Sequence, residues 1–427
     1  MFSLSKKAFI DKNTAKNIEI LVVIIYLLYF LDIQFPYSLS SIFNAISYPI
    51  TFVLVALYWK KILYVATRNI PLLIFIGIAL ISFLWTTNMA NTSDGSRGLL
   101  RTFLFGSYFV TRYSLKEQIK ILVCVFGLVA IISILFCAFF PHYAYITNGW
   151  AGIFPYKNLL GRAMVLSSML FSLILIKSSI KDSWFVFFAL IGLGVSTLLI
   201  LISNSSMSLL LFLTMLPQTF FYFVVRQKYR TRFIFVSLIF ILLLLVFASI
   251  FFNLETIFVD ILGEGLTFNG RTPIWTLMTE KILDERPVLG YGYQAFWSSD
   301  AGSHVIMHTW ASLNALPIPT TFNAHNAYIE IFASLGFLGL FSYGAVLINA
   351  LYKIAILLFS TKKLEFFWLF QFLVFILLAS LADVGIGLGN TSSYGILSIA
   401  AFLSISLEYE RFRKQKKLKT ATINYIL

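Results

Sequence analysis

The chain has 427 residues, of which 59% are hydrophobic and only 12% are charged. Water-soluble domains usually carry about a quarter charged residues and fewer than half apolar ones. This composition excludes a soluble globular protein, and the near-continuous apolar runs exclude a protein with a single membrane anchor. The fold class that remains is an all-α protein that crosses the membrane many times. The formal net charge of +14 and the 17% aromatic content then need an explanation within a membrane.

The apolar runs predict about twelve transmembrane helices, because one helix needs about 20 mostly apolar residues to cross the bilayer. The first run follows a polar, basic segment and is too long for the core of a cleavable signal peptide, so we expect an uncleaved first span. The twelve runs, some of them short, lie at 18–35, 42–59, 70–85, 99–112, 119–140, 160–177, 184–202, 207–225, 233–252, 334–358, 365–382 and 393–408.

The distribution of charge predicts the orientation of these spans. With both termini in the cytoplasm, 25 of the 32 bases and seven of the 18 acids fall on the cytoplasmic side. The inner face then carries +18 and the outer face −4, as the positive-inside rule requires. The net charge is therefore explained by topology and by contact with the lipid bilayer, and it gives no reason to expect nucleic-acid binding.

One long outer loop divides the chain. Residues 253–333 separate a bundle of nine predicted spans (1–252) from one of three spans with a basic cytoplasmic tail (334–427). Long loops are usually functional, and this one carries three of the four histidines. Within it, Thr272 is the expected N-cap of a helix that ends near Glu285. Its apolar residues recur at a spacing of four (Ile274, Met278, Ile282), which favours an amphipathic helix on the membrane surface.

The end of the loop carries a candidate general base. The stretch 298–321 is expected to be an irregular lid, and Asn323 is the expected N-cap of the next helix. His325 would then lie in the first turn, where the helix dipole lowers its pKa and leaves it neutral at pH 7. The alternative is a surface histidine that caps the helix or meets lipid headgroups.

Arginines at membrane depth are candidates for anion binding. Arg101, Arg162 and Arg271 lie near the outer membrane plane and together could hold a phosphate or diphosphate. Alternatively, each arginine reaches the headgroups separately. Asp32, Asp383 and Glu330 read as isolated acids that are hydrogen-bonded within the bundle, and Cys124 and Cys137 are too far apart along one helix to pair. No motif indicates a metal or another cofactor.

Three motifs resemble the O-antigen ligase and polymerase superfamily. His325-Asn326 followed after nine residues by Gly336-Phe337-Leu338-Gly339 resembles the family pattern at the end of the large outer loop. The runs 266–275 and 287–292 resemble the Gly-Arg…Trp…Pro-x-x-Gly-x-Gly segment that opens it. Residues 152–161, with Lys157-Asn158, resemble an element of exopolysaccharide polymerases. The run 203–208 departs from the family because it lacks the usual base near Met207.

The resemblance implies a GT-C-like membrane glycosyltransferase in the bacterial cytoplasmic membrane, with its active site facing outward. The donor would be an oligosaccharide on undecaprenyl diphosphate, and the acceptor a glycan, the lipid A core or a protein. His325 would be the base of an inverting, metal-independent transfer, and Arg271 would be catalytic. The resemblance also implies contacts to the substrate or its diphosphate from Arg101, Lys157, Asn158, Arg162, Asn326, Trp275 and Tyr291.

The choice between a ligase and a polymerase remains open, since both enzymes use the same donor. The Lys-Asn element slightly favours a polysaccharide or O-antigen polymerase, for which a chain-length regulator is a candidate partner. The alternative from another class is a multi-pass transporter or flippase of a lipid-linked or anionic substrate. A purely structural scaffold explains neither the long loop nor the order of the motifs. The sequence does not indicate the sugar, the linkage or the oligomeric state.

Overall fold

The computed structural model describes residues 12–34, 37–146, 148–177, 183–228, 270–309, 322–384, 388 and 392–426. The first half contains α1 (Lys12–Tyr29), α2 (Tyr37–Ala66), α3 (Ile70–Ile81), η1 (Ser82–Leu84), α4 (Met89–Arg112), α5 (Leu115–Phe139), α6 (Pro141–Ala144), α7 (Lys157–Lys177), α8 (Ser183–Ile202) and α9 (Ser206–Val225). The second half contains α11 (Arg271–Glu285), η3 (Phe296–Ser298), α12 (Asp300–Met307), α13 (Ala327–Thr361), α14 (Leu364–Ala379) and α15 (Ser393–Ile426). Between α6 and α7, β1 (Tyr145–Ile146) pairs antiparallel with β2 (Gly149–Trp150).

The helices confirm a mostly helical membrane protein. Eleven of the twelve predicted spans fall on helices, and the run 233–252 lies outside the described residues. Six helices of the described part are long and apolar enough to cross a bilayer, namely α2, α5, α7, α8, α9 and α13, while α3 with η1 and α14 are shorter apolar helices. The total of twelve spans and the division into three parts remain predictions.

Polar caps explain where several of these helices begin. The side chains of Asn69, Asn88 and Ser205 accept hydrogen bonds from backbone amides in the first turns of α3, α4 and α9. Ser114 and Glu117 form a capping box at the start of α5. The first amides of a helix have no acceptor within it, so these side chains fix where each helix starts.

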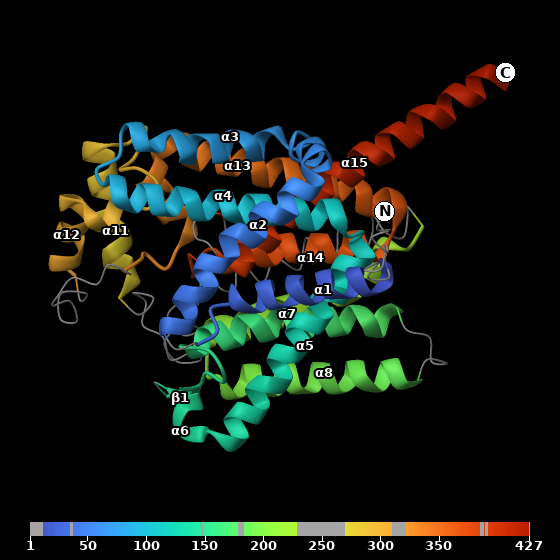
Figure 1. The fold of residues 1–427 in the computed structure, drawn as a ribbon, viewed down its shortest axis with the longest axis horizontal. Helices are drawn as coiled ribbons and strands as arrows, with labels where there is room; N and C mark the ends of the chain where they lie inside the picture. The colour runs from blue at the N-terminus through green and yellow to red at the C-terminus, as the bar shows by residue number, and fades with distance from the viewer. Residues whose placement is uncertain are drawn as a thin grey trace, which may run out of the picture.

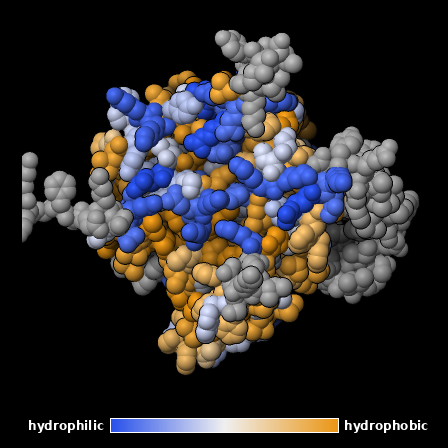
Figure 2. Space-filling view, turned by 90° about the vertical axis from the view of Figure 1, so that its right-hand side faces the viewer, coloured by the Kyte–Doolittle hydropathy of each residue, from blue (hydrophilic) through white to orange (hydrophobic). Residues whose placement is uncertain are grey.

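The two ends of the bundle differ. Figure 1 shows the long helices side by side, with α11, α12 and the β1 segment at one end and both termini at the other. Helix α13 packs against α3, α14 and α15, and α7 packs against α5, α8 and α9. Figure 2 views the end that carries the termini, where hydrophilic residues gather across the middle of the face between hydrophobic flanks. The charge pattern predicts that this end faces the cytoplasm, and that orientation remains a prediction.

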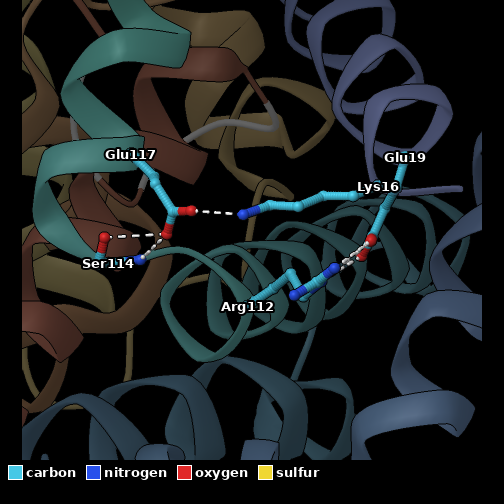
Figure 3. Close-up of polar contacts among 5 residues, drawn as sticks. All are labelled: Lys16, Glu19, Arg112, Ser114 and Glu117. Carbon is cyan, nitrogen blue, oxygen red and sulfur yellow. Dashed lines mark hydrogen bonds and ion pairs between the residues drawn. The ribbon is translucent and has the colours of Figure 1, made fainter. Parts of the chain in front are cut away.

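A cluster of ion pairs holds the start of α1 against α4 and α5 (Figure 3). Arg112 donates to both carboxylate oxygens of Glu19 over 2.8–3.0 Å, and Lys16 pairs with Glu117 at 2.7 Å. A bidentate arginine–carboxylate pair has a fixed geometry. The cluster therefore fixes the position of the first helix relative to the two helices that follow α3.

The described part of the long loop is a packed unit with its own small core. Helix α11 begins at Arg271 after Gly270, whose φ is 79°, so the predicted cap Thr272 lies inside the helix. The apolar face of α11 is buried against the rest of the loop and α13, which corrects the predicted position on the membrane surface. The core consists of Ile274, Met278, Ile282, Tyr291, Phe296, Ala301, Val305, Ala324, Phe332 and Ala333.

The stretch predicted as an irregular lid is partly helical. Residues 300–307 form α12, which begins at the N-cap Ser299 and buries Val305 and Ile306. The polar composition of 298–309 concealed this helix because only one of its faces is apolar. The remainder of the predicted lid, residues 310–321, lies outside the described residues.

Helix α13 is interrupted at Gly336, where the turn from the loop joins it. Gly336 has φ 60° and ψ −157°, and a Cβ there would lie 2.6 Å from the carbonyl oxygen of Pro287. The turn hydrogen-bonds on both sides of the interruption, through the amide of Phe337 to Pro287 O (2.8 Å) and the amide of Tyr291 to Ala333 O (3.0 Å). The backbone at Gly336 therefore packs closely against this turn, where only glycine leaves enough room.

Candidate active site

Three segments that are distant in sequence meet at the turn that follows α14. The amide of Ala327 donates to Ser380 O over 2.8 Å. The guanidinium of Arg271 donates to Ala382 O over 3.3 Å. Arg162 Nη1 forms an ion pair with Asp383 Oδ2 at 2.7 Å. Residues 380–383 thus connect the start of the loop, its end and helix α7.

Arg162 is buried near the start of α7 and is only 5% exposed. The carboxylates of Asp383 and Asp32 both lie close enough to stabilise its charge, and its guanidinium lies 5.8 Å from the ring centre of Tyr394. Its Nε also donates to Asn158 O over 3.3 Å. A buried cation is tolerated only when it is paired, so the two acids hold this arginine in place.

His325 lies just before α13 rather than in its first turn. The N-cap of α13 is Asn326, whose Oδ1 accepts from the amides of Tyr328 and Ile329, so the predicted cap Asn323 is wrong. Asn323 Oδ1 instead accepts from the amide of His325 over 2.9 Å, and His325 adopts φ 50°. Positive φ is uncommon in any residue other than glycine, histidine included, and costs about 1–3 kcal/mol. The surrounding contacts therefore impose this conformation.

Hydrogen bonds from the loop helices hold the histidine segment. The indole of Trp275 donates to Ala324 O over 2.7 Å. Glu330 Oε1 accepts from the indole of Trp297 over 2.8 Å and from the amide of Ala324 over 2.6 Å. Glu330 is hydrogen-bonded as expected, but to residues of the long loop rather than within the bundle of spans. Trp275 uses its indole N–H to position the segment that carries His325.

The electrostatic environment lowers the pKa of His325 below its usual value. Burial is the main cause, followed by the positive charge of Arg271, and Arg162 adds to it. The carboxylate of Asp383 acts in the opposite direction. The predicted lowering of the pKa of His325 agrees with this, but its causes are burial and the neighbouring arginines instead of the helix dipole. The imidazole is therefore mainly neutral at pH 7 and able to accept a proton.

Tyr291 is not available to stack on a sugar. Its side chain is 2% exposed, packs edge-to-face on Phe296 with ring centres 5.1 Å apart, and donates a hydrogen bond to Glu285 over 2.7 Å. Burial and the neighbouring Glu285 raise the pKa of this phenol well above its usual value. Its side chain holds the end of α11 against the turn 287–292, and in this structure it is not exposed for the predicted contact with the substrate.

Lys157 and Asn158 form the start of α7, next to the turn between α8 and α9. A Cβ added to Gly149 would meet both the side chain of Lys157 and the backbone of Ser203. Lys157 is half-buried and Asn158 is exposed. The lysine therefore lies beside the run 203–208, where the family usually has a base.

Arg101 has a different set of neighbours. Its Nη1 donates to Asn44 Oδ1 over 2.6 Å and to Ser47 Oγ over 2.8 Å. Its guanidinium lies over the rings of Tyr48 and Phe30, at 4.3 and 4.7 Å from their centres. These contacts hold Arg101 between α4 and α2, whereas Arg162 and Arg271 meet at the turn 380–383.

Sequence reasoning missed the acids of the site. Asp383 and Asp32 read as isolated carboxylates, but the structure brings both to Arg162, together with Tyr394. The available signal was the position of both acids at outer span ends, at the depth of an arginine that needed a counter-ion. Among the described residues, no group of three or more His, Cys, Asp or Glu side chains could hold a metal ion.

A comparison with known protein families finds a match over the long loop and the helices on either side of it. Residues 187–344 match a family model described as O-antigen ligase. The predicted resemblance to the O-antigen ligase and polymerase superfamily is confirmed. The matched range includes Arg271, His325 and Asn326, whereas Lys157 and Arg162 precede it. It indicates a membrane enzyme of the O-antigen ligase and polymerase type. No curated protein matches the chain significantly.

Proposed function

We propose that this protein is a glycosyltransferase that transfers or polymerises an oligosaccharide carried on undecaprenyl diphosphate, on the outer side of the bacterial cytoplasmic membrane. The observation that carries the proposal is the meeting of His325, Arg271 and Arg162 around residues 380–383. A neutral base beside two cations is what such a transfer needs. The acceptor must lose a proton while the leaving diphosphate gains negative charge.

His325 is the general base in this proposal. Its imidazole takes the proton of the acceptor hydroxyl as the oxygen attacks the anomeric carbon of the donor. The bond between that carbon and the diphosphate oxygen breaks, and the configuration at the carbon inverts. The lowered pKa of His325 keeps the base in its active form at neutral pH. General-base catalysis contributes roughly 10²–10⁴-fold to such reactions.

Arg271 and Arg162 stabilise the leaving diphosphate. Guanidinium groups bind phosphate oxygens in a bidentate manner and keep their charge at all relevant pH values. Asp383 positions Arg162, and Asn326 positions the histidine segment by capping α13. Lys157 and Asn158, at the exposed start of α7, provide further contacts for the anion, because helix N-termini favour negative charge. The proposal uses arginine charge and needs no metal ion.

We favour a polymerase slightly over a ligase. The Lys157-Asn158 element resembles that of exopolysaccharide polymerases, and its lysine lies next to Ser203. In a polymerase the acceptor is a second lipid-linked glycan, whereas in a ligase it is the lipid A core or a protein. The two differ in their products, which form a ladder of repeat units or a single transferred glycan.

Replacement of His325 tests the proposal. The purified full-length protein is given an undecaprenyl-diphosphate-linked oligosaccharide and an acceptor, and the products are separated by size. We expect His325→Ala to lower the rate of transfer by at least about 100-fold, because the reaction loses its base. His304→Ala, the same substitution on α12, is the matched control and should transfer normally. Transfer by His325→Ala at the rate of the unmodified protein would contradict the assignment.

A further inference from the structure

A pocket of about 570 Å³ lies between α2 and α4 and has no role in the proposed reaction. It is lined by Asn44, Tyr48, Asp94, Arg97, Gly98 and Arg101. The two helices pack against each other. None of the lining residues contacts the turn 380–383 in the hydrogen bonds and ion pairs described above. The pocket is therefore a second polar site of the molecule.

Arg101 gives this pocket a buried positive charge. The residue is 6% exposed, and its hydrogen-bond partners Asn44 and Ser47 are neutral. Within the described part of the chain, its Nε has no hydrogen-bond partner. The acid that lines the pocket, Asp94, pairs with Arg97 on the adjacent turn of α4. No carboxylate lining the pocket pairs with Arg101, so the charge of its guanidinium can attract an anion.

The surroundings of the pocket indicate that this anion belongs to a lipid. Helix α4 changes along its length from the polar run 89–98 to the apolar run 99–112, and the pocket lies at this boundary. On α2, several of the side chains that follow Tyr48 are apolar and exposed, among them Phe52 (74% exposed) and Leu57 (69% exposed). A pocket at a polar–apolar boundary beside an exposed apolar helix suits a headgroup whose chains lie along the helix.

We propose that this pocket binds the phosphate headgroup of an anionic membrane lipid, with the lipid chains lying along the exposed face of α2. The charge of Arg101 would hold a phosphate oxygen by a charge-assisted hydrogen bond, and Arg97 at the rim would attract the headgroup. The rings of Tyr48 and Phe30 keep the guanidinium in place in the absence of a carboxylate. Two lipids carry this chemistry, an acidic phospholipid of the bilayer and a polyprenyl phosphate.

Lipid binding to the purified full-length protein tests the proposal. The protein in a neutral detergent is titrated separately with phosphatidylglycerol, phosphatidylcholine and undecaprenyl phosphate, and bound lipids are counted by native mass spectrometry. We expect at least one anionic lipid to bind more tightly than phosphatidylcholine. Arg101→Gln should weaken that binding about tenfold or more, because a charge-assisted hydrogen bond is lost.

Control variants separate this site from loss of folding and from the active site. Arg101→Lys keeps the charge and should retain most of the binding, and Lys281→Gln removes one charge from α11 and should bind normally. Arg271→Gln should leave the binding of phosphatidylglycerol unchanged and should weaken only the binding of undecaprenyl phosphate at the proposed active site, so failure of the catalytic proposal is distinguishable from failure of this one. If Arg101→Gln loses binding to phosphatidylglycerol, the ligand of the pocket is an acidic phospholipid of the bilayer. If it loses binding to undecaprenyl phosphate, the ligand is a polyprenyl phosphate. Equal binding of anionic lipids by the unmodified protein and Arg101→Gln would overturn the proposal, as would equally tight binding of phosphatidylcholine.

Discussion

At the scale of single residues, His325 is subject to opposing electrostatic influences. Burial, Arg271 and Arg162 disfavour its protonated form, while the carboxylate of Asp383 favours it. The same carboxylate pairs with Arg162 at 2.7 Å. Asp383 therefore connects the proposed base to the proposed diphosphate site, and a change in its charge affects both.

The pH dependence of transfer follows from these charges. A general base works only when it is deprotonated, so kcat/KM should fall as the pH drops through the pKa of His325. Since that pKa is lowered, the acidic limb should lie below the usual value of about 6.5. Asp383→Asn removes the charge that raises the pKa and should move the limb to still lower pH. Asp383→Glu keeps the charge and serves as the control. A limb above 6.5, or an upward shift in Asp383→Asn, would contradict the assignment.

The chemistry of the site could be predicted from the sequence, but its pairings could not. The motifs indicated His325, Arg271 and Arg162 because each stands beside a distinctive local pattern. Asp383 and Asp32 lack such a pattern, and their role depends on the contact of the turns after α14 and α1 with α7. Such contacts between distant segments are set by packing, which spacing along one chain does not encode.

At the scale of elements, the interruption of α13 joins two of the family motifs. The turn 287–292 supplies hydrogen bonds to the backbone where α13 is broken at Gly336. The span itself was predicted from its apolar run, but the interruption was not, since hydropathy does not report backbone conformation. The starts of α11 and α13 were misplaced by two and three residues for a related reason. Gly270 and Asn326 are the caps, whereas Thr272 and Asn323 are equally good caps by residue type.

Substitution of Gly336 should destabilise the protein. In Gly336→Ala, the alanine would have to adopt φ 60°, and its Cβ would collide with the backbone of Pro287 and Val288. We expect a loss of about 2–3 kcal/mol in stability, from the positive φ and the collision together. Gly344→Ala in the same helix meets no atom within 4 Å and is the matched control. Thermal unfolding in detergent measures both, and equal melting temperatures for the two variants would rule out this role of Gly336.

At the scale of the whole molecule, the polar features gather at the two ends of the helical bundle. The loop helices and the candidate active site are at one end, and the termini and the Glu19–Arg112 cluster belong to the other. The sequence could predict this separation because basic residues are unevenly distributed between successive loops. It could not predict that the loop packs its own apolar core instead of lying on the membrane.

The predicted orientation can be tested with one cysteine at each end. Cys124 and Cys137 are both free, so Cys124→Ala with Cys137→Ala gives a background without thiols. In this background, Glu280→Cys on α11 should react with a membrane-impermeant maleimide in intact cells, because the predicted orientation places the loop outside. Lys116→Cys, at a position where the side chain is 72% exposed, should react only after the cells are permeabilised. The reverse pattern would place the histidine and arginine site in the cytoplasm, where a donor displayed outside the membrane could not reach it.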